Sequence, residues 1–388
     1  MPAVVSSTVL PAVRVKGGVK RPRTRYDFGS PVKLPAGGEC DRCFYPLKLD
    51  VFGKGCPHNC HYCYARSVLD FRDLWRVEAA VASFDSIQRA LDGKALAPYV
   101  SRRLPVRLGG MTDCFASNPR ARLITKNVLW LLSLRQHPHL CFTKSDSIAS
   151  DFYRPVLNPS LAYIQFTITT DNDALAARME PNAPPPSARL RAVSDLVARG
   201  FRVAVRVNPL FPTHEDGFFT GGSRRHPSRR FDYFNLSLVD RIADSGAQTL
   251  IAGMVRLSSW NRRWLEEAGF DCAWLFHPST RQRNSAFHYS LDEKRHYYSL
   301  VSECCRARGV AFSICYDGDE DYLAFRDLWN DPNDCCNAAA QLAAFRGRGF
   351  ASVNSSFLAT PSPSLSFDAQ ALDSTGAAGV ERPQPHDI

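Results

Sequence analysis

Three cysteines lie close together in the segment GKGCPHNCHYCYAR, which spans residues 53–66. Cys56, Cys60 and Cys63 follow the spacing C-x3-C-x2-C. Structural zinc sites usually take four ligands from two C-x2-C-like pairs, whereas iron–sulfur clusters accept thiolates from compact loops. A four-iron cluster held by three cysteines leaves one iron open to bind and activate a small molecule. The segment therefore predicts an iron–sulfur site, with a zinc or purely structural cluster site as the alternative.

A second group of cysteines lies at the two ends of the chain's folded part. Cys40 and Cys43 form a C-x2-C pair before the first predicted strand, and Cys335 and Cys336 are adjacent in NDPNDCCNA. Chain ends often meet on a domain surface, so these four thiols are candidates for a second site, either zinc or an auxiliary iron–sulfur cluster. Unligated thiols are the alternative.

The remaining candidates for metal chemistry have simpler interpretations. Cys304, Cys305 and Cys315 fall in a helix-then-strand pattern, YYSLVSECCRARGVAFSICYD, where core packing is expected. His277, His288 and His296 show no paired metal-ligand spacing.

The cysteine loop must be positioned by the elements around it, and the chain alternates between two patterns. Strand-like runs occupy residues 47–53, 105–110, 139–144, 162–169, 201–208 and 247–254. Helical periodicity is clear at 120–136, 185–200 and 234–246. Such alternation predicts a parallel sheet with right-handed crossovers. Six units within residues 47–270 are too few for a closed eight-strand barrel, so we expect an α/β partial (β/α)6 barrel, with its chemistry at the carboxyl ends of the strands.

Composition is that of an ordinary globular protein, with 388 residues, 45% hydrophobic and 22% charged. Thirteen cysteines in such a chain indicate metal or redox chemistry rather than a disulfide framework. No run approaches a membrane span, and the N-terminal segment lacks the basic region of a signal peptide. We therefore expect a cytoplasmic protein.

Positive charge is concentrated in two segments. Residues 1–35 carry seven Lys and Arg against Asp27 alone, a net charge of 7 − 1 = +6. The second segment, GGSRRHPSRRFDYF, sets four arginines beside aromatics: Arg224, Arg225, Arg229 and Arg230. Cations interleaved with aromatics suit phosphate contact and base stacking, so DNA or RNA is the expected partner, against a merely solvated surface.

These patterns divide the chain into four parts. Residues 1–35 are a basic arm, 36–270 the barrel core, 271–350 an α/β extension, and 351–388, rich in Ser, Ala and Pro, a disordered tail.

The C-x3-C-x-aromatic-C form, placed after the first strand, resembles the radical S-adenosylmethionine (SAM) superfamily. The motifs that follow are GGMTDCFASNP, TKSDSIASD, FTITTDND, RMEPNAPPPSARL and VRVNPLFP, in that order. Their succession is similar to the spore photoproduct lyase-like, DNA repair photolyase-related branch, over roughly residues 45–255.

The resemblance implies a [4Fe–4S] cluster on Cys56, Cys60 and Cys63, SAM on the open iron, and formation of a 5′-deoxyadenosyl radical. An electron donor such as flavodoxin or ferredoxin is implied as well. Residues matching the cofactor positions are Tyr62 beside the adenine, Gly109 and Gly110 near the methionine, Thr112, Lys144, and Thr167 or Thr169. Asp113, Glu180 and Arg189 belong to the same motifs, with a direct role and a structural salt bridge or cap equally open.

One position departs from the family. Spore photoproduct lyases proper carry a hydrogen-donating cysteine just ahead of the strand-two T/S-D pair, where this chain has Gly110. Cys114 is a substitute candidate, with a buried structural role as the alternative, and Tyr64 resembles a tyrosine of the family's hydrogen transfer.

Two classes of function follow from these observations. One is a nucleic-acid enzyme, either a lesion-repair lyase or an isomerase-like enzyme that rearranges a modified pyrimidine, which tolerates the missing thiol. The other is a radical SAM enzyme acting on a peptide or small molecule, with the basic segments only solvated.

Overall fold

The computed structural model describes residues 31–33, 45, 47–53, 55–70, 75, 79–94, 96–97, 100, 104–212, 233–270, 281–283, 286–315, 319–332 and 334–342. All of them belong to one compact unit, residues 1–346.

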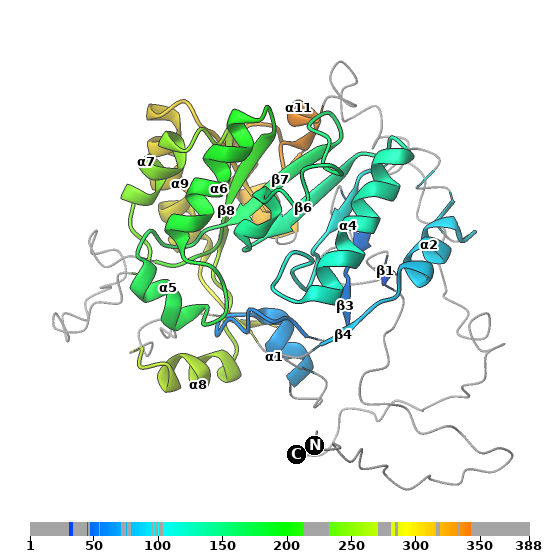
Figure 1. Cartoon of the computed structure of the whole chain (residues 1–388). Helices are drawn as coiled ribbons and strands as arrows, with labels where there is room; N and C mark the ends of the chain where they lie inside the picture. The colour runs from blue at the N-terminus through cyan, green and yellow to red at the C-terminus, as the bar shows by residue number, and fades with distance from the viewer. Residues whose placement is uncertain are drawn as a thin grey trace, which may run out of the picture. The chain divides into compact units, whose positions relative to one another are not determined.

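An eight-stranded sheet forms the centre of this unit, in the order β1-β2-β5-β6-β7-β8-β9-β12 (Figure 1). Only the pairing of β1 with β2 is antiparallel; the other seven strands run parallel. The strands are β1 (Val32–Lys33), β2 (Lys48–Leu49), β5 (Val106–Leu108), β6 (His139–Thr143), β7 (Ala162–Thr167), β8 (Arg202–Leu210), β9 (Thr249–Met254) and β12 (Ala311–Ile314). Spatial order in this sheet therefore follows chain order.

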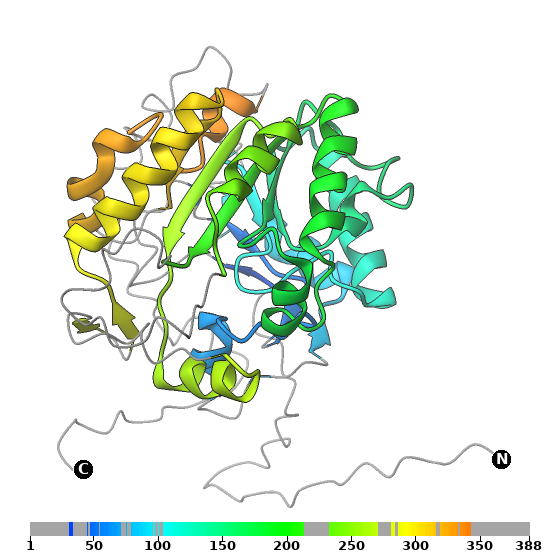
Figure 2. The ribbon, with the colours of Figure 1, turned by 90° about the vertical axis from the view of Figure 1, so that its left-hand side faces the viewer.

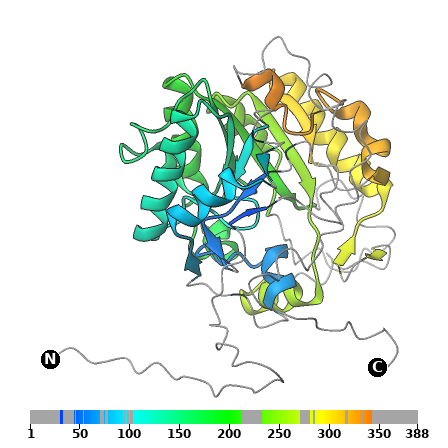
Figure 3. The same cartoon turned by 90° about the vertical axis from the view of Figure 1, so that its right-hand side faces the viewer.

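Helices return the chain from the end of one strand to the start of the next. Most of them lie along the outside of the curved sheet, whereas α8 (Ser259–Glu267) lies beside α1 (Tyr64–Asp70) at one end of it (Figures 2 and 3). The crossover helices are α2 (Phe84–Asp92), α4 (Pro119–Leu134), α5 (Asp173–Met179), α6 (Pro186–Ala198), α7 (Ser237–Asp244), α8 (Ser259–Glu267) and α9 (Leu291–Ala307). Their starts are set by local chemistry: Asn118 caps α4 ahead of Pro119, and Ser290 with Glu293 forms a capping box on α9.

Side chains along β8 point alternately to the two faces of the sheet. Val203, Val205 and Val207 are fully buried, and each such side chain contributes roughly 1.5–3 kcal/mol of transfer free energy. Arg206 lies between two of these valines and projects from the opposite face of the sheet. The helices pack on the valine side, so polar chemistry is left to the inner face.

Short elements complete the described residues. Two small antiparallel strand pairs lie outside the main sheet. They join β3 (Phe52–Gly53) to β4 (Ala80–Val81) and β10 (Arg281–Arg283) to β11 (Ala286–His288). The others are α1 (Tyr64–Asp70), α10 (Asp319–Phe325), α11 (Ala338–Gln341) and two 3-10 turns, Asp146–Ala149 and Arg326–Leu328.

The predicted fold class is confirmed, with one addition. All six predicted strand runs and all three predicted helices form where the patterns place them. The helix-then-strand pattern of the extension is also correct, and its strand β12 pairs with β9, which adds a seventh parallel strand to the sheet. No described helix is long and apolar enough to cross a membrane.

Candidate active site

The cysteine loop occupies residues 56–63, directly before α1, at the carboxyl end of the first parallel strand (Figure 1). Cys56 and Cys60 are buried, and Cys63 is half-buried. Two turns shape the loop: the Asn59 amide donates to the Cys56 carbonyl at 3.3 Å, and the Cys63 amide donates to the Cys60 carbonyl at 3.2 Å. Asn59 has a φ of +50°, a conformation that Asn tolerates better than most residues. The turns bring three thiols of one short segment together.

Distant segments hold this loop in place through its backbone. The His61 amide donates to the carbonyl of Met179, at the end of α5, at 3.0 Å. The Asn182 side chain donates to the Pro57 carbonyl at 2.8 Å. On the other side, buried Asn261 in the first turn of α8 donates to the His61 carbonyl at 2.9 Å. Two segments far from the loop in sequence, residues 179–182 and the start of α8, thus fix the positions of the cysteines.

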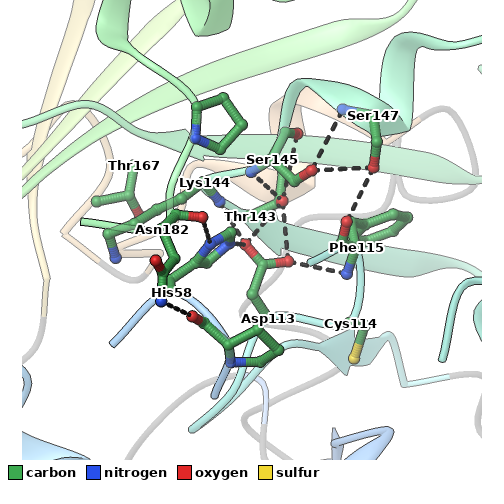
Figure 4. Close-up of polar contacts among 12 residues, drawn as sticks. His58, Asp113, Cys114, Phe115, Thr143, Lys144, Ser145, Ser147, Thr167 and Asn182 are labelled. Atoms are coloured by element: carbon green, nitrogen blue, oxygen red, sulfur yellow. Dashed lines mark hydrogen bonds and ion pairs between the residues drawn. The ribbon is translucent and has the colours of Figure 1, made fainter. Parts of the chain in front are cut away.

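His58 anchors the loop through its side chain. Its Nε2 lies 2.8 Å from Asp113 Oδ2, and its Nδ1 lies 3.2 Å from the Asn182 carbonyl oxygen (Figure 4). A carboxylate and a carbonyl both accept hydrogen bonds, so each ring nitrogen of His58 faces an acceptor. The loop is therefore tied to the strand-two motif by a buried ion pair, with both side chains less than 10% exposed.

Asp113 is the centre of a wider hydrogen-bond network. Besides His58, its carboxylate accepts from the Phe115 amide at 2.9 Å, the Thr143 hydroxyl at 3.0 Å and the Lys144 amide at 2.6 Å (Figure 4). Burial alone would raise the pKa of Asp113, but the positive His58 and these donors hold it below its usual value. The T-D and T-K-S motifs therefore meet on one ionised carboxylate.

A second buried ion pair lies on the other side of the loop. Glu180 accepts from the Tyr62 hydroxyl and from Arg189, and all three side chains are buried. Arg189 also donates to the Pro184 carbonyl at 2.8 Å and to the Thr167 carbonyl at 2.9 Å. Burial opposes ionisation of Glu180, yet Arg189 and Lys144 lower its pKa. This ion pair fixes the Glu-Pro segment at residues 180–181, next to the residues that contact the cysteine loop.

Lys144 contributes the free cation of the site. Its ammonium lies 5.4 Å from the centroid of the Tyr62 ring, and no described residue pairs with it in a hydrogen bond or an ion pair. Burial works against its charge, but the nearby Cys60 and Glu180 raise its pKa. An ammonium next to the cysteine loop can bind a carboxylate.

The two threonines proposed from strand four differ in their surroundings. The Thr169 side chain is buried and its hydroxyl lies 3.1 Å from the Tyr233 hydroxyl. Thr167 is half-buried at the end of β7, and its hydroxyl has no hydrogen-bond partner among the described residues. Thr167 is thus the better placed of the two to contact a ligand, and Figure 4 shows it next to Lys144.

The donor set of the loop fits an iron–sulfur cluster. It consists of thiols alone, supplied by one compact segment, which is how such clusters are bound. Burial raises the pKa of Cys56 to about 12 and also raises the pKa values of Cys60 and Cys63. The thiols therefore carry protons until a metal replaces them. Among the described residues, no three His, Cys, Asp or Glu side chains gather closely enough to hold a single metal ion.

Comparison with known proteins gives a clear result for structure. No protein-family model matches the chain, and no curated protein matches it. A spore photoproduct lyase double mutant with bound AdoMet and dinucleoside spore photoproduct matches with a TM-score of 0.54, at 15% identity, over 75% of this chain and 79% of that chain. Spore photoproduct lyase complexed with dinucleoside spore photoproduct gives 0.51, at 14% identity, over 76% and 81%. The chain has the spore photoproduct lyase fold. The resemblance inferred from the motifs is confirmed at this level.

Within this fold, the two strand-two glycines have structural reasons of their own. Gly109 has a φ of +87°, and a Cβ there would lie 2.5 Å from the Phe142 carbonyl oxygen. A Cβ on Gly110 would lie 3.1 Å from the Lys48 side chain. Gly109 is therefore required by the neighbouring strand. The Thr112 hydroxyl donates to Asp50 at 3.1 Å, so its contact with a cofactor stays a prediction.

The two residues proposed for hydrogen transfer lie in different environments. Cys114 is fully buried, and its thiol donates to the Leu49 carbonyl at 3.6 Å. Figure 4 shows its sulfur pointing away from the Asp113 network. This placement favours the structural role of Cys114. Tyr64 is exposed, and its hydroxyl lies 3.4 Å from the Gly110 carbonyl.

Several predicted residues lie outside the described part of the chain: the basic arm apart from residues 31–33, which include strand β1, together with Cys40, Cys43 and the four arginines of residues 224–230. The described half of the second cysteine group, Cys335 and Cys336, is buried. Next to it, Tyr45 donates to Asp334 at 2.8 Å. Tyr45, two positions after Cys43, therefore lies beside Asp334, the residue before Cys335.

Four residues of the site were not singled out by the sequence. They are His58, Asn182, Asn261 and Asp50, whose carboxylate accepts from the Met111 and Thr112 amides. The only local signal among them was the S-x-x-N capping box of Ser258 and Asn261.

Proposed function

We propose that the protein is a radical SAM enzyme that acts on a nucleic-acid base. The observation that carries the proposal is the combination of three thiols in one short loop with the ammonium of Lys144, which has no hydrogen-bond or ion-pair partner among the described residues, both at the carboxyl ends of parallel strands in a spore photoproduct lyase fold. In parallel α/β sheets this edge is where ligands bind and catalytic residues gather.

The residues divide into those that would bind and those that position. Cys56, Cys60 and Cys63 would hold a [4Fe–4S] cluster, and Lys144 and Thr167 would bind polar groups of SAM. When bound together, cluster and SAM supply a 5′-deoxyadenosyl radical that removes a hydrogen atom from the substrate. The electron comes from a donor such as flavodoxin or ferredoxin.

The protein's own contribution is to orient these groups. His58 and Asp113 fix the first turn of the loop, and Tyr62 with Glu180 fixes the second. Because both links are buried ion pairs or hydrogen bonds, the thiols are held in position before the cofactor arrives.

The proposed substrate follows from charge and from the neighbours of the fold. Residues 1–35 carry a net charge of +6, and four arginines are set among aromatics at 224–234. Spore photoproduct lyase itself binds a dinucleoside photoproduct. A pyrimidine in DNA is therefore the favoured target. A rearrangement or other base modification is favoured over lesion reversal, since Gly110 stands where a donor thiol would be expected and Cys114 is buried.

The test uses the full-length chain, reconstituted anaerobically with iron and sulfide and reduced in the presence of SAM. The expected product is 5′-deoxyadenosine, and deuterium from the labelled nucleic-acid substrate should pass into it. Cys60→Ala should abolish this product, whereas Cys304→Ala, a partly exposed thiol on α9, should leave it unchanged. Product formation by Cys60→Ala would disprove the cluster assignment.

The nucleic-acid part of the proposal has a test of its own. Binding of DNA or RNA should weaken steeply with salt, and neutralising Arg224, Arg225, Arg229 and Arg230 should reduce the slope. Absent or salt-independent binding would leave a peptide or small molecule as the substrate.

A further inference from the structure

The cysteine loop has an apolar side that the proposed function does not yet use. Cys56 packs in one small cluster with Ala65, in the first turn of α1, and with Trp75, and all three side chains are buried. Cys63 and Met111, both half-buried, pack against the same cluster. Two of the three proposed ligand thiols therefore share one apolar environment.

The two largest side chains of this environment suit a protective cover. Trp75 is 5% exposed, and an aromatic side chain of this kind buries about 150–250 Å². Met111 is positioned through its backbone, because its amide donates to the buried carboxylate of Asp50 at 3.1 and 3.3 Å. Its thioether is flexible and can fill an irregular gap. A rigid ring and an adaptable chain thus cover the same part of the loop.

The third proposed ligand has different neighbours. Cys60 is buried but does not belong to that apolar cluster. Burial raises the pKa of Cys60, which the charge of Lys144 lowers and that of Glu180 raises. Lys144 is the cation that the proposed function assigns to SAM. The apolar cluster therefore covers the part of the loop that carries Cys56 and Cys63, and leaves Cys60 beside the groups that would bind SAM.

An apolar cover changes the redox chemistry of a bound iron–sulfur cluster. The reduction potential of such a cluster depends on solvent exposure and on the apolar shell around it. Three thiolates make the bound cluster a net anion, and reduction adds one more negative charge, which water stabilises better than an apolar wall does. Excluding water therefore makes the cluster harder to reduce and, once reduced, a stronger reductant.

We propose that Trp75 and Met111 exclude water from the Cys56 and Cys63 side of the cluster and thereby keep its reduction potential low. The inference rests on the proposed function, because it concerns the same cluster. One electron enters from the protein donor and leaves to SAM, whose carbon–sulfur bond then breaks. A cluster that must give an electron to SAM has to be a strong reductant, so the cover serves the reaction without touching the substrate.

The first test needs no cluster. The full-length chain, metal-free and with its thiols reduced, is treated with iodoacetamide, and the alkylation of each cysteine is followed by mass spectrometry of its peptides. Trp75→Ala should raise the alkylation rates of Cys56 and Cys63 about threefold or more, because the reactivity of a thiol depends on its exposure. Alkylation of Cys304, a half-buried thiol on α9, should not change.

The second test measures the potential directly. The chain is reconstituted with iron and sulfide, and its reduction is titrated without SAM and followed by electron paramagnetic resonance. Trp75→Ala should raise the ratio of reduced to oxidised cluster about tenfold at a given potential, a shift of about 59 mV for one electron. Trp75→Phe keeps an apolar ring and should restore most of the wild-type potential. Trp130→Ala, which removes an exposed ring on α4, should leave it unchanged.

Met111→Ala gives a second reading, and it replaces Trp75→Ala if that variant does not fold. It should raise the potential in the same direction, by less than Trp75→Ala because the removed side chain is smaller and only half-buried.

Three outcomes would overturn the proposal: unchanged potentials in Trp75→Ala and Met111→Ala, an equal shift in Trp130→Ala, or faster alkylation without any shift in potential. A wild-type chain that takes up no cluster contradicts the proposed function itself. A chain that forms 5′-deoxyadenosine, with the same potential in wild type and Trp75→Ala, keeps its proposed function and loses only the apolar cover.

Discussion

Asp113→Asn is the most informative single change, because one carboxylate links three separate segments. Asp113 accepts from His58, the Phe115 amide, the Thr143 hydroxyl and the Lys144 amide, all in the buried interior. An Asn side chain keeps one accepting oxygen and turns a donating NH2 toward groups that also donate. His58 would lose the carboxylate that it contacts.

The expected cost follows from that loss. Removing one partner of a buried ion pair costs about 3–5 kcal/mol, out of a total stability of about 5–15 kcal/mol for a typical domain. Urea unfolding monitored by circular dichroism measures the change in the free energy of unfolding. Iron bound per chain after reconstitution should fall as well, since His58 fixes the first turn of the cysteine loop.

The pH dependence gives an independent reading of the same pair. Burial would raise the pKa of Asp113, but His58 and the surrounding donors lower it. A group with a lowered folded pKa contributes stability that is present above its unfolded pKa and lost as the pH falls through the folded value. The wild type should therefore lose stability below about pH 4 more steeply than the variant.

The control is Asp151→Asn, which removes an exposed carboxylate paired with Arg154 at 2.9 Å. It should change the free energy of unfolding by less than about 0.5 kcal/mol. A loss below about 1 kcal/mol for Asp113→Asn, or an unchanged acid slope, would refute the argument that this carboxylate is ionised and holds the loop.

Two further predictions concern strand two. Gly109→Ala should lower the midpoint of thermal unfolding far more than Gly200→Ala. Both glycines have φ above +80°, but only a Cβ at residue 109 would meet a carbonyl oxygen, at 2.5 Å. Equal shifts of the two midpoints would contradict this reasoning. Cys114→Ala should leave both the amount of 5′-deoxyadenosine formed and any deuterium transfer from substrate within about twofold of wild type. The reason is that the Cys114 thiol is buried against the Leu49 carbonyl. A loss of about tenfold or more would restore Cys114 as a hydrogen donor.

The strands could be predicted because each one repeats a local signal. Runs such as AYIQFT and RVAVRV are rich in β-branched and aromatic residues, and both faces of a central parallel strand are buried. The cysteine loop carries its signal in spacing alone. His58 and Asn182 carry none, and the capping box of Asn261 marks only a helix start, because each residue acts through partners 55 to 200 positions away.

Interpretation of individual motif residues was less reliable than recognition of the motifs. The glycine pair was expected to admit a ligand, yet Gly109 is required by the carbonyl of the next strand. That contact depends on how closely β5 and β6 approach each other, which no local pattern records. Cys315 was expected to pack in the core, yet its sulfur lies 2.9 Å from Arg206 on the inner face.

The contacts divide the motif residues into those that hold the cysteine loop and those whose side chains remain able to bind a ligand. Four motif residues form hydrogen bonds with one another and with the backbone around the cysteine loop: Asp113, Thr143, Glu180 and Arg189. Lys144 keeps an ammonium with no partner among the described residues, although its own amide is bonded to Asp113. A side chain held by its backbone, with its charge uncommitted, is preorganised to bind a ligand.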